Sequence, residues 1–149
     1  MADATLNLLI IVPESEYFKG PVNSLSVVTQ EGEITILPHH ADYVSNVEIS
    51  ALTLRYNGHV KYFAIGGGAI NINQKNNEVD LCVNSIESVE EIDLARAERS
   101  KKLAEERLLN ASKIADPEES LREQQKAEIR LKRALNRISV KNRYSDKVV

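Results

Sequence analysis

Four basic residues near the C-terminal end of the chain have a spacing that could bind an anion. They are Arg130, Arg133, Arg137 and Lys141, called the basic arc below. At about 100° per residue, these positions share an arc of roughly 80° on a helix. No acidic residue stands between Arg130 and Tyr144. Because like charges three and four positions apart repel each other, the pattern indicates an anionic partner, either an acidic protein segment or a polyphosphate.

Two other interpretations of the basic arc stay open. Most charge runs on helices are solvated faces with pairs at i and i+4, and the basic arc could be one of them. Nucleic acid would also compensate the charge, but no aromatic residues are interleaved to stack on bases. The net charge of −3 and the isoelectric point near 5.7 give no overall attraction to nucleic acid or anionic lipid.

Glycine and histidine clusters offer two weaker candidates. Gly66–Gly68 could suggest a phosphate-binding loop, yet no helical pattern follows and no Lys-Ser/Thr pair closes it. A turn or close backbone packing is therefore the better interpretation. His39 and His40 would point in opposite directions on an extended chain, and only His59 remains to join them. We therefore predict surface or packing roles for these histidines and no metal site.

The remaining titratable residues form no recognisable catalytic set. Glu14, Glu16 and Glu33 do not make an acid/base pair, and no serine or cysteine has a plausible base beside it in the sequence. Cys82 is the only cysteine, which excludes an internal disulfide and fits a reducing compartment. The prediction is a protein that is not an enzyme.

Composition predicts a soluble chain of one or two small domains. The 149 residues are 42% hydrophobic and 28% charged. No apolar run approaches the roughly 18 residues that a membrane span needs. The start, Met1 to Leu9, lacks the basic residues and apolar core of a signal peptide. We therefore expect the chain to stay in the compartment where it is made.

Residues 1–87 have the period of β-strands. Leu52, Leu54 and Tyr56 alternate with polar residues up to Asn57-Gly58, a pair that tolerates the positive φ of a type I′ turn, and the alternation then resumes. Similar patterns predict further hairpins around Pro13, Glu31-Gly32 and Lys75–Asn77. Many short strands with no helix among them indicate an antiparallel β-sandwich or flattened barrel.

Residues 88–149 change to a helical period. Ser88 and Glu91 have the spacing of a capping box, which predicts a helix beginning at Ser88. Asp116-Pro117 predicts the start of a second helix. The expected apolar stripes are Leu94, Ala97, Ala104, Leu108 and Ala111 in the first helix, and Leu121, Ala127, Leu131, Ala134, Leu135 and Ile138 in the second. A short connection and a seam of small residues predict an antiparallel, mobile hairpin.

Four motifs in order carry a family resemblance that covers Thr5 to Arg143. They are "EGEITILPHHA", "FAIGGGAININ", "EIDLARAERSKKLAEERL" and "LKRALNRISV". Together they resemble the epsilon subunit of bacterial rotary ATP synthases. The resemblance implies a non-catalytic central-stalk subunit, peripheral on the cytoplasmic face of the bacterial plasma membrane. In this family the sandwich contacts the gamma subunit and the c-ring and couples rotation to the proton-driven synthesis of ATP, and the helical hairpin inhibits ATP hydrolysis.

The resemblance also implies contact residues. Glu33 corresponds to the glutamate that contacts the c-ring, and His40 to the histidine that faces gamma. It gives the basic arc a partner too, an acidic loop on the catalytic beta subunit, within the head that beta forms with alpha.

Some members of this family bind ATP in the folded hairpin. The positions here that match are Glu87, Ile92, Asp93, Arg96, Ala97, Arg133 and Arg137. The resemblance implies that Asp93 accepts from the adenine amino group and that the arginines hold phosphates. Leu103 stands where those members have an arginine, and losing a charged hydrogen bond weakens binding by about 1.5–3 kcal/mol. We therefore expect weak or absent ATP binding and no other cofactor.

Two further interpretations of these predicted ATP-binding residues remain. Asp93 and Arg96 could simply pair with each other on the helix surface. If ATP does bind, the hairpin would instead be an ATP-sensing regulatory module, within the complex or free of it.

Overall fold

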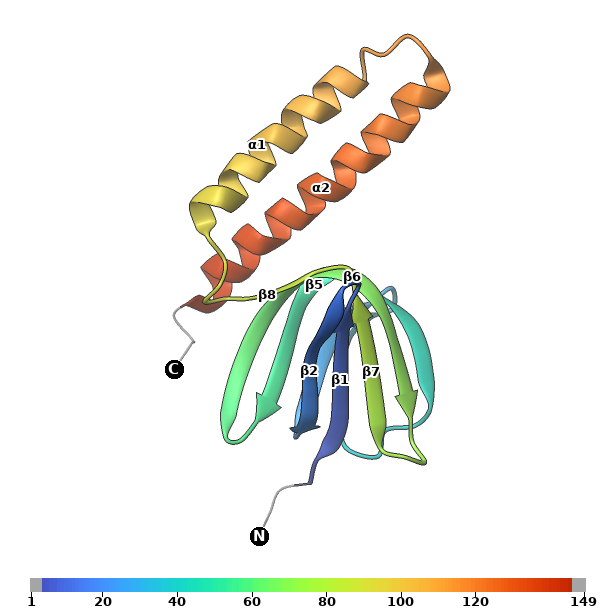
Figure 1. The fold of residues 1–149 in the computed structure, drawn as a ribbon, viewed down its shortest axis with the longest axis vertical. Coiled ribbons are helices and arrows are strands. Elements are labelled where there is room, and N and C mark those ends of the chain that lie inside the picture. Colours follow the sequence, from blue (N-terminus) through green and yellow to red (C-terminus); the bar gives the residue numbers. More distant parts are fainter. Residues whose placement is uncertain (1–3, 146–149) are drawn as a thin grey trace.

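The computed structural model describes residues 4–145, which form an N-terminal β-sandwich and a C-terminal helical hairpin (Figure 1). The strands are β1 (Leu6–Val12), β2 (Ser15–Val22), β3 (Ser24–Thr29), β4 (Gly32–Ile36), β5 (Tyr43–Tyr56), β6 (His59–Asn73), β7 (Glu78–Val83) and β8 (Ile86–Ser88). The helices are α1 (Leu94–Ala111) and α2 (Pro117–Tyr144). The predicted fold class is confirmed. The predicted end of the second domain, residue 149, lies outside the described residues.

The strands join in the order β2-β1-β7-β6-β5-β3-β4, and β8 pairs with β6 beyond the end of β7. β5 and β6 are long and curve over the core, so the sheet folds back on itself (Figure 1). The interior holds side chains that are at most 1% exposed, among them Leu8, Ile10, Leu25, Leu52 and Leu81. One pairing departs from the predicted antiparallel pattern, because β1 and β7 run parallel.

The turn between β5 and β6 forms at Asn57-Gly58, as predicted. Asn57 has a φ of 53° and Gly58 a φ of 74°, the left-handed values that a type I′ turn requires. β5 begins at Tyr43, before the alternation that the sequence shows from Leu52, and pairs with β6 from Tyr43 to Tyr56. This pairing forms the surface against which α2 packs.

Close packing explains the three consecutive glycines. A Cβ on Gly68 would overlap the carbonyl oxygen of Cys82, and one on Gly66 would overlap Oγ of Ser85. Gly67 has a φ of 84°, which residues with a side chain rarely adopt. The prediction of close backbone packing is confirmed.

The predicted start of the first helix is wrong. Only half of the predicted capping box forms: Glu91 N donates to Ser88 Oγ at 3.3 Å, but the Glu91 carboxylate accepts from the Ser88 hydroxyl at 2.9 Å and not from its backbone N–H. Ser88 is the last residue of β8 and is paired with Phe63, so these bonds close only a turn. α1 begins at Leu94, with the Asp93 carboxylate as N-cap accepting from Arg96 N at 3.1 Å.

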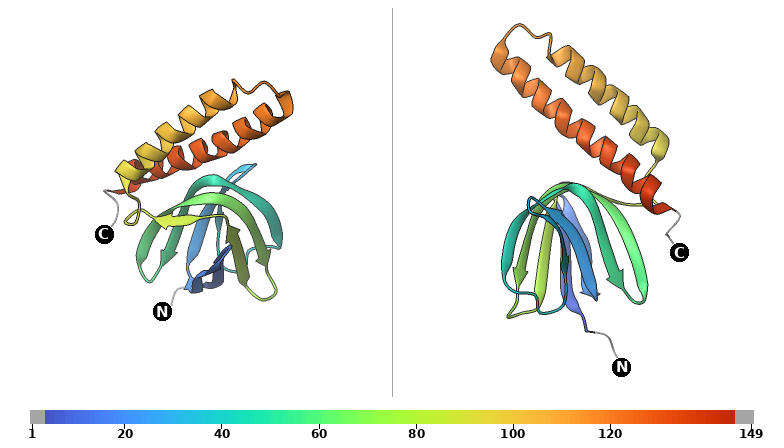
Figure 2. Two further views of the ribbon diagram at one scale, coloured as in Figure 1. Left: turned by 45° about the horizontal axis from the view of Figure 1, so that its top comes forward. Right: turned by 180° about the vertical axis from the view of Figure 1, so that it is seen from behind.

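α1 and α2 lie side by side as an antiparallel hairpin (Figure 2). Asp116 caps α2 by accepting from Glu118 N at 3.3 Å, as its position predicted. None of the described helices is long and apolar enough to span a membrane.

Alanines and one serine form the seam between the helices. The seam residues, all buried, are Ala97, Ala104 and Ala111 of α1 and Ser120, Ala127 and Ala134 of α2. Leu121 and Leu135 were predicted in the seam, but they are 56% and 43% exposed. The seam of α2 repeats every seven residues, and each leucine is one position further, about 100° around the helix. Leu94, also predicted in the seam, is exposed on the first turn of α1.

Candidate functional site

The C-terminal half of α2 packs on the sandwich through polar contacts from one helix face. The side-chain amide of Asn136 donates to the carbonyl oxygens of Ser50 at 2.8 Å and Ile65 at 3.3 Å. Five residues further along α2, Lys141 Nζ donates to the carbonyl oxygen of Val89 at 2.8 Å. These bonds connect α2 to β5, to β6 and to the segment between β8 and α1.

A small apolar cluster lies beside these hydrogen bonds. Its buried members are Ala64, Val89, Ile92 and Val140, with Ala51, Tyr62 and Tyr144 packed against them. The rings of Tyr62 and Tyr144 stack at 4.1 Å between centroids and 8° between planes. The cluster is separate from the interior of the sandwich, so the hairpin rests on its own small contact area.

Three of the four residues of the basic arc face this junction, so the arc is not an ordinary solvated face. Arg137 Nε lies 3.8 Å from Glu87 Oε1, and Lys141 binds the carbonyl of Val89. The Nε of Arg133 is buried and has no hydrogen-bond partner among the described residues. Arg130, further from the sandwich along α2, is exposed.

A hollow of about 330 Å³ lies between the start of α1 and α2. Its lining residues are Glu87, Glu91, Asp93, Arg96, Ala97, Ser100 and Arg137. Five of the seven residues predicted to bind a nucleotide are among them: Glu87, Asp93, Arg96, Ala97 and Arg137. Ile92 is 3% exposed and belongs to the apolar cluster instead. Most of the predicted set therefore lines one cavity.

A second hollow, of about 280 Å³, adjoins the first because Ser100 and Arg137 line both. The other residues around it are Leu103, Ala104, Arg107, Arg130 and Arg133. Four arginines and no carboxylate thus surround this space. Leu103, 47% exposed, stands on its α1 side.

Sequence reasoning missed several of these lining residues. Glu91, Ser100 and Arg107 were not in the predicted nucleotide set. Ser100 and Arg107 follow Arg96 at four and eleven positions, the spacing of one helix face, so a search along α1 from Arg96 would have found them.

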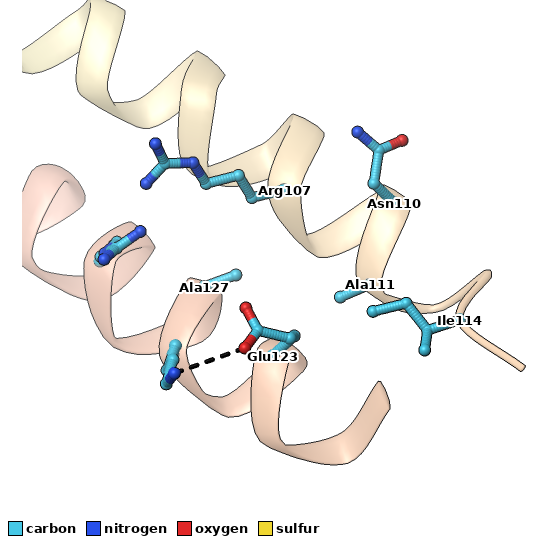
Figure 3. A pocket seen from close by; sticks show the side chains of 8 residues that line it. Arg107, Asn110, Ala111, Ile114, Glu123 and Ala127 are labelled. Carbon is cyan, nitrogen blue, oxygen red and sulfur yellow. Dashed lines mark hydrogen bonds and ion pairs between the residues drawn. The ribbon is translucent and has the colours of Figure 1, made fainter. Parts of the chain in front are cut away.

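A third hollow, of about 400 Å³, continues along the hairpin away from the sandwich. Figure 3 shows Arg107, Asn110 and Ile114 on one side and Ala127 and Glu123 on the other. Glu123 is paired there with Lys126 at 3.4 Å. Arg107 and Arg130 line this hollow as well as the second one, so the three hollows follow one another beside the alanine seam. Small seam residues leave this space between the helices.

Asp93 and Arg96 do not form the surface ion pair that was the alternative to nucleotide binding. The Asp93 carboxylate accepts from the backbone N–H of Arg96, and no ion pair between the two side chains is formed in the described structure. The carboxylate is therefore held at the N-terminus of α1, where it also faces the first hollow.

Glu91 connects the first hollow to the sandwich. Its Oε1 accepts from the hydroxyl of Tyr17 in β2 at 3.2 Å, besides the bond from Ser88. Burial, and next the negative charge of Glu91, raise the pKa of Tyr17 to about 12. Tyr17 is therefore a neutral hydrogen-bond donor throughout the physiological pH range.

The other predicted contact residues lie outside the hollows. Glu33 is exposed on β4. His40 is half-buried in the loop after β4, with Nδ1 2.7 Å from the carbonyl oxygen of Ala41 and its ring 6.2 Å from that of Tyr43. Among residues 4–145, no group of three histidine, cysteine, aspartate or glutamate side chains is arranged to hold a metal ion.

Comparisons with known proteins agree with this architecture. Residues 5–89 match the model of the ATP synthase delta/epsilon chain β-sandwich domain, and residues 90–142 match that of its long α-helix domain. The ATP synthase epsilon chain of Ruminococcus albus is 37% identical over 94% of this chain and 98% of its own length. That of Bacillus cytotoxicus is 34% identical over 93% of this chain and 97% of its own.

Solved structures share the fold. One chain in a structure of the Euglena gracilis mitochondrial ATP synthase (OSCP/F1/c-ring) aligns with a TM-score of 0.69 at 23% identity, covering 87% of this chain and 76% of that one. One chain in a structure of the central stalk/c-ring of the Tetrahymena thermophila mitochondrial ATP synthase aligns with a TM-score of 0.59 at 17% identity, covering 91% of this chain and 99% of that one. With both domain models matched in order, and relatives above 30% identity along nearly the whole length, the chain belongs to the delta/epsilon chain family of ATP synthases, as an epsilon chain.

Proposed function

We propose that this chain is a non-catalytic central-stalk subunit of a proton-transporting ATP synthase, and that its hairpin inhibits ATP hydrolysis. In this proposal the sandwich couples rotation by contacting gamma through His40 and the c-ring through Glu33, on the cytoplasmic face of the bacterial plasma membrane. The hairpin reaches the catalytic beta and alpha subunits when it leaves the sandwich.

One observation carries the inhibitory part. Three residues of the basic arc, Arg133, Arg137 and Lys141, lie on the α2 face that packs on the sandwich. This face can meet an acidic segment of the beta subunit only after the hairpin has separated from the sandwich. Arg133 has no ion pair among the described residues, so an anionic partner would satisfy a charge that the folded state leaves unpaired.

The direct test is ATP hydrolysis by the reconstituted catalytic head with the full-length chain and with a version ending at Ser88. This end point keeps β8 paired with β6. Higher hydrolysis with the truncated version is expected. If both versions bind gamma and hydrolysis does not change, the hairpin is not the inhibitor, and the role contracts to coupling and assembly.

A full-length variant gives a second test of the beta-subunit contact. Arg130→Gln removes the exposed charge of the basic arc, for which no bond to the sandwich is found in the described chain. It should raise hydrolysis without changing the packing of the hairpin. Arg122→Gln, an exposed arginine nearer the start of α2, is the matched control and should behave like the unaltered chain.

The second candidate function is an ATP-sensing module. It is supported by the five predicted nucleotide residues around the first hollow and the four arginines around the second. Because Leu103 supplies no charge, we expect binding to be weak. Titration calorimetry that gave a micromolar dissociation constant would overturn this expectation. Relief of the inhibition by ATP would then favour the sensor.

A further inference from the structure

We propose that α2 contains an adjustable latch in which Asn136 holds the hairpin on the sandwich and the buried Nε of Arg133 opposes it. The two residues are three positions apart, so both face the same part of the sheet. Their opposing contributions keep the closed state close in free energy to the open one. Its use as a switch for inhibition rests on the proposed function, whereas the latch itself is a property of the isolated chain.

Asn136 supplies the holding contact. Its amide group has two N–H donors, and the structure directs Nδ2 at two backbone carbonyls, those of Ser50 in β5 and Ile65 in β6. Ser50 and Ile65 are directly opposite each other in the β5–β6 pairing. One side chain therefore fixes α2 to both strands at once, and the position of the bond depends on their register.

Arg133 supplies the opposing contribution. Its Nε lies in a narrow gap lined also by Ala64, Ile65 and Ser85, and a Cβ on Gly66 would be only 3.4 Å away. No acceptor reaches this N–H within the described chain. A buried donor without a partner loses its hydration and gains nothing in return. When α2 leaves the sheet, water can bind the Nε of Arg133, so opening is favoured at this residue.

The rest of the contact is small enough for these two residues to matter. The apolar part has four buried side chains, of which two are valines and one is Ala64, and beside them the rings of Tyr62 and Tyr144 stack. Polar contacts beside it include the bond of Lys141 to Val89 and the ion pair of Arg137 with Glu87, whose side chains are 25% and 40% exposed. Because this contact is small, a change in free energy at Asn136 or Arg133 should measurably shift the balance between the closed and the open state.

Arg133→Lys isolates the opposing contribution. Lysine places a methylene group where arginine has Nε, so the buried donor disappears while the positive charge remains. The measurement is hydrogen exchange, on the isolated full-length protein, of the α2 backbone amides from Ile138 to Lys141, since this end of the helix loses its tertiary support when it leaves the sandwich. We expect about tenfold slower exchange. Arg130→Lys makes the same chemical change at an exposed position and should leave exchange unaltered. Unchanged or faster exchange in Arg133→Lys would overturn the proposal.

Asn136→Asp tests the holding contact. The substitution keeps the side-chain shape but removes both donors and turns a carboxylate toward two carbonyl oxygens. We expect exchange of the same amides to be at least about tenfold faster. Asn142→Asp adds the same charge at an exposed position of α2 and serves as the control. Equal exchange in the two variants would also contradict the latch.

The two proposals fail in different experiments. The exchange measurements need no partner subunit, so they can support the latch even if truncating the hairpin leaves ATP hydrolysis unchanged. Conversely, a truncation effect on hydrolysis together with no difference between Arg133→Lys and Arg130→Lys would keep the inhibitory function and exclude the latch.

Discussion

Arg137 Nε lies 3.8 Å from Glu87 Oε1, which joins α2 to β8 in the lining of the first hollow. Both residues are part of the predicted nucleotide set, and they are paired with each other before any ligand arrives. A phosphate that approaches Arg137 must therefore compete with the carboxylate of Glu87 for the guanidinium. This competition, together with Leu103, is consistent with weak ATP binding.

Leu103→Arg should strengthen ATP binding. The new guanidinium would reach the hollow that Arg107, Arg130, Arg133 and Arg137 already surround. One charged hydrogen bond to a phosphate is worth about 1.5–3 kcal/mol, or roughly a tenfold to hundredfold lower dissociation constant. Titration calorimetry on the isolated chain measures it. Leu109→Arg, on an exposed position of α1 that lines none of the three hollows, should not change the affinity.

Tyr17→Phe should change how stability depends on alkaline pH. The folded-state pKa of Tyr17 is raised from 10.0 to about 12, so folding favours the neutral phenol. This contribution is complete below pH 10 and is lost as the pH rises from 10 to about 12. Urea unfolding between pH 9 and 12 should therefore show a shallower fall of the unfolding free energy in Tyr17→Phe. Parallel curves for the two proteins would contradict the assignment.

Gly68→Ala should destabilise the sandwich by about 3 kcal/mol, because the new methyl group would overlap the backbone of Cys82 and Val83, which cannot rotate away. Gly20→Ala is the matched control. A Cβ there would come no closer than 3.8 Å to Phe18, and its φ is compatible with a side chain. We expect that control to be neutral or slightly stabilising in urea unfolding. Similar losses in both variants would exclude close packing as the reason for Gly68.

Glu33→Lys should lower coupled ATP synthesis in membrane vesicles. Glu33 is exposed on β4, so the substitution removes no internal contact and the folded chain should keep its stability. Its effect would come from reversing the charge toward the proposed c-ring partner. Glu98→Lys makes the same charge change on an exposed position of α1 and should leave synthesis unaltered. Unchanged synthesis in Glu33→Lys would argue against the contact.

Where local chemistry decides the structure, the sequence was sufficient. Asn57-Gly58 tolerates the positive φ values of its turn wherever it occurs, and the β5–β6 hairpin follows from the alternation on either side. In the same way, the helical period of the C-terminal residues predicted the α1–α2 hairpin. The parallel pairing of β1 with β7 could not be predicted, because a strand pattern does not specify a partner distant in the chain.

The start of α1 shows how a non-local contact overrides a local signal. Glu91 N donates to Ser88 Oγ as expected, yet Ser88 pairs with Phe63, and Val89 N donates to the carbonyl of Tyr62 at 3.1 Å. These strand contacts hold the backbone extended through Ser88. The helix therefore begins only after the next capping residue, Asp93.

The candidate site was predictable in its residues but not in its surroundings. Spacing on α2 identified the basic arc, and the resemblance identified most of the lining of the first hollow. The direction in which the basic arc faces depends on how α2 packs. The carbonyl partners of Asn136 are 86 and 71 residues away in the sequence, where no periodicity could point to them.

The parallel pair of β1 and β7 has a consequence for the order of events during synthesis on the ribosome. Strands β3 to β6 can pair with their neighbours as soon as each emerges, and β1 can pair with β2. β1 and β6, however, are joined through β7, which ends at Val83. The nascent sandwich therefore stays open until β7 has left the ribosome, and the edge of β1 is exposed to other chains until then.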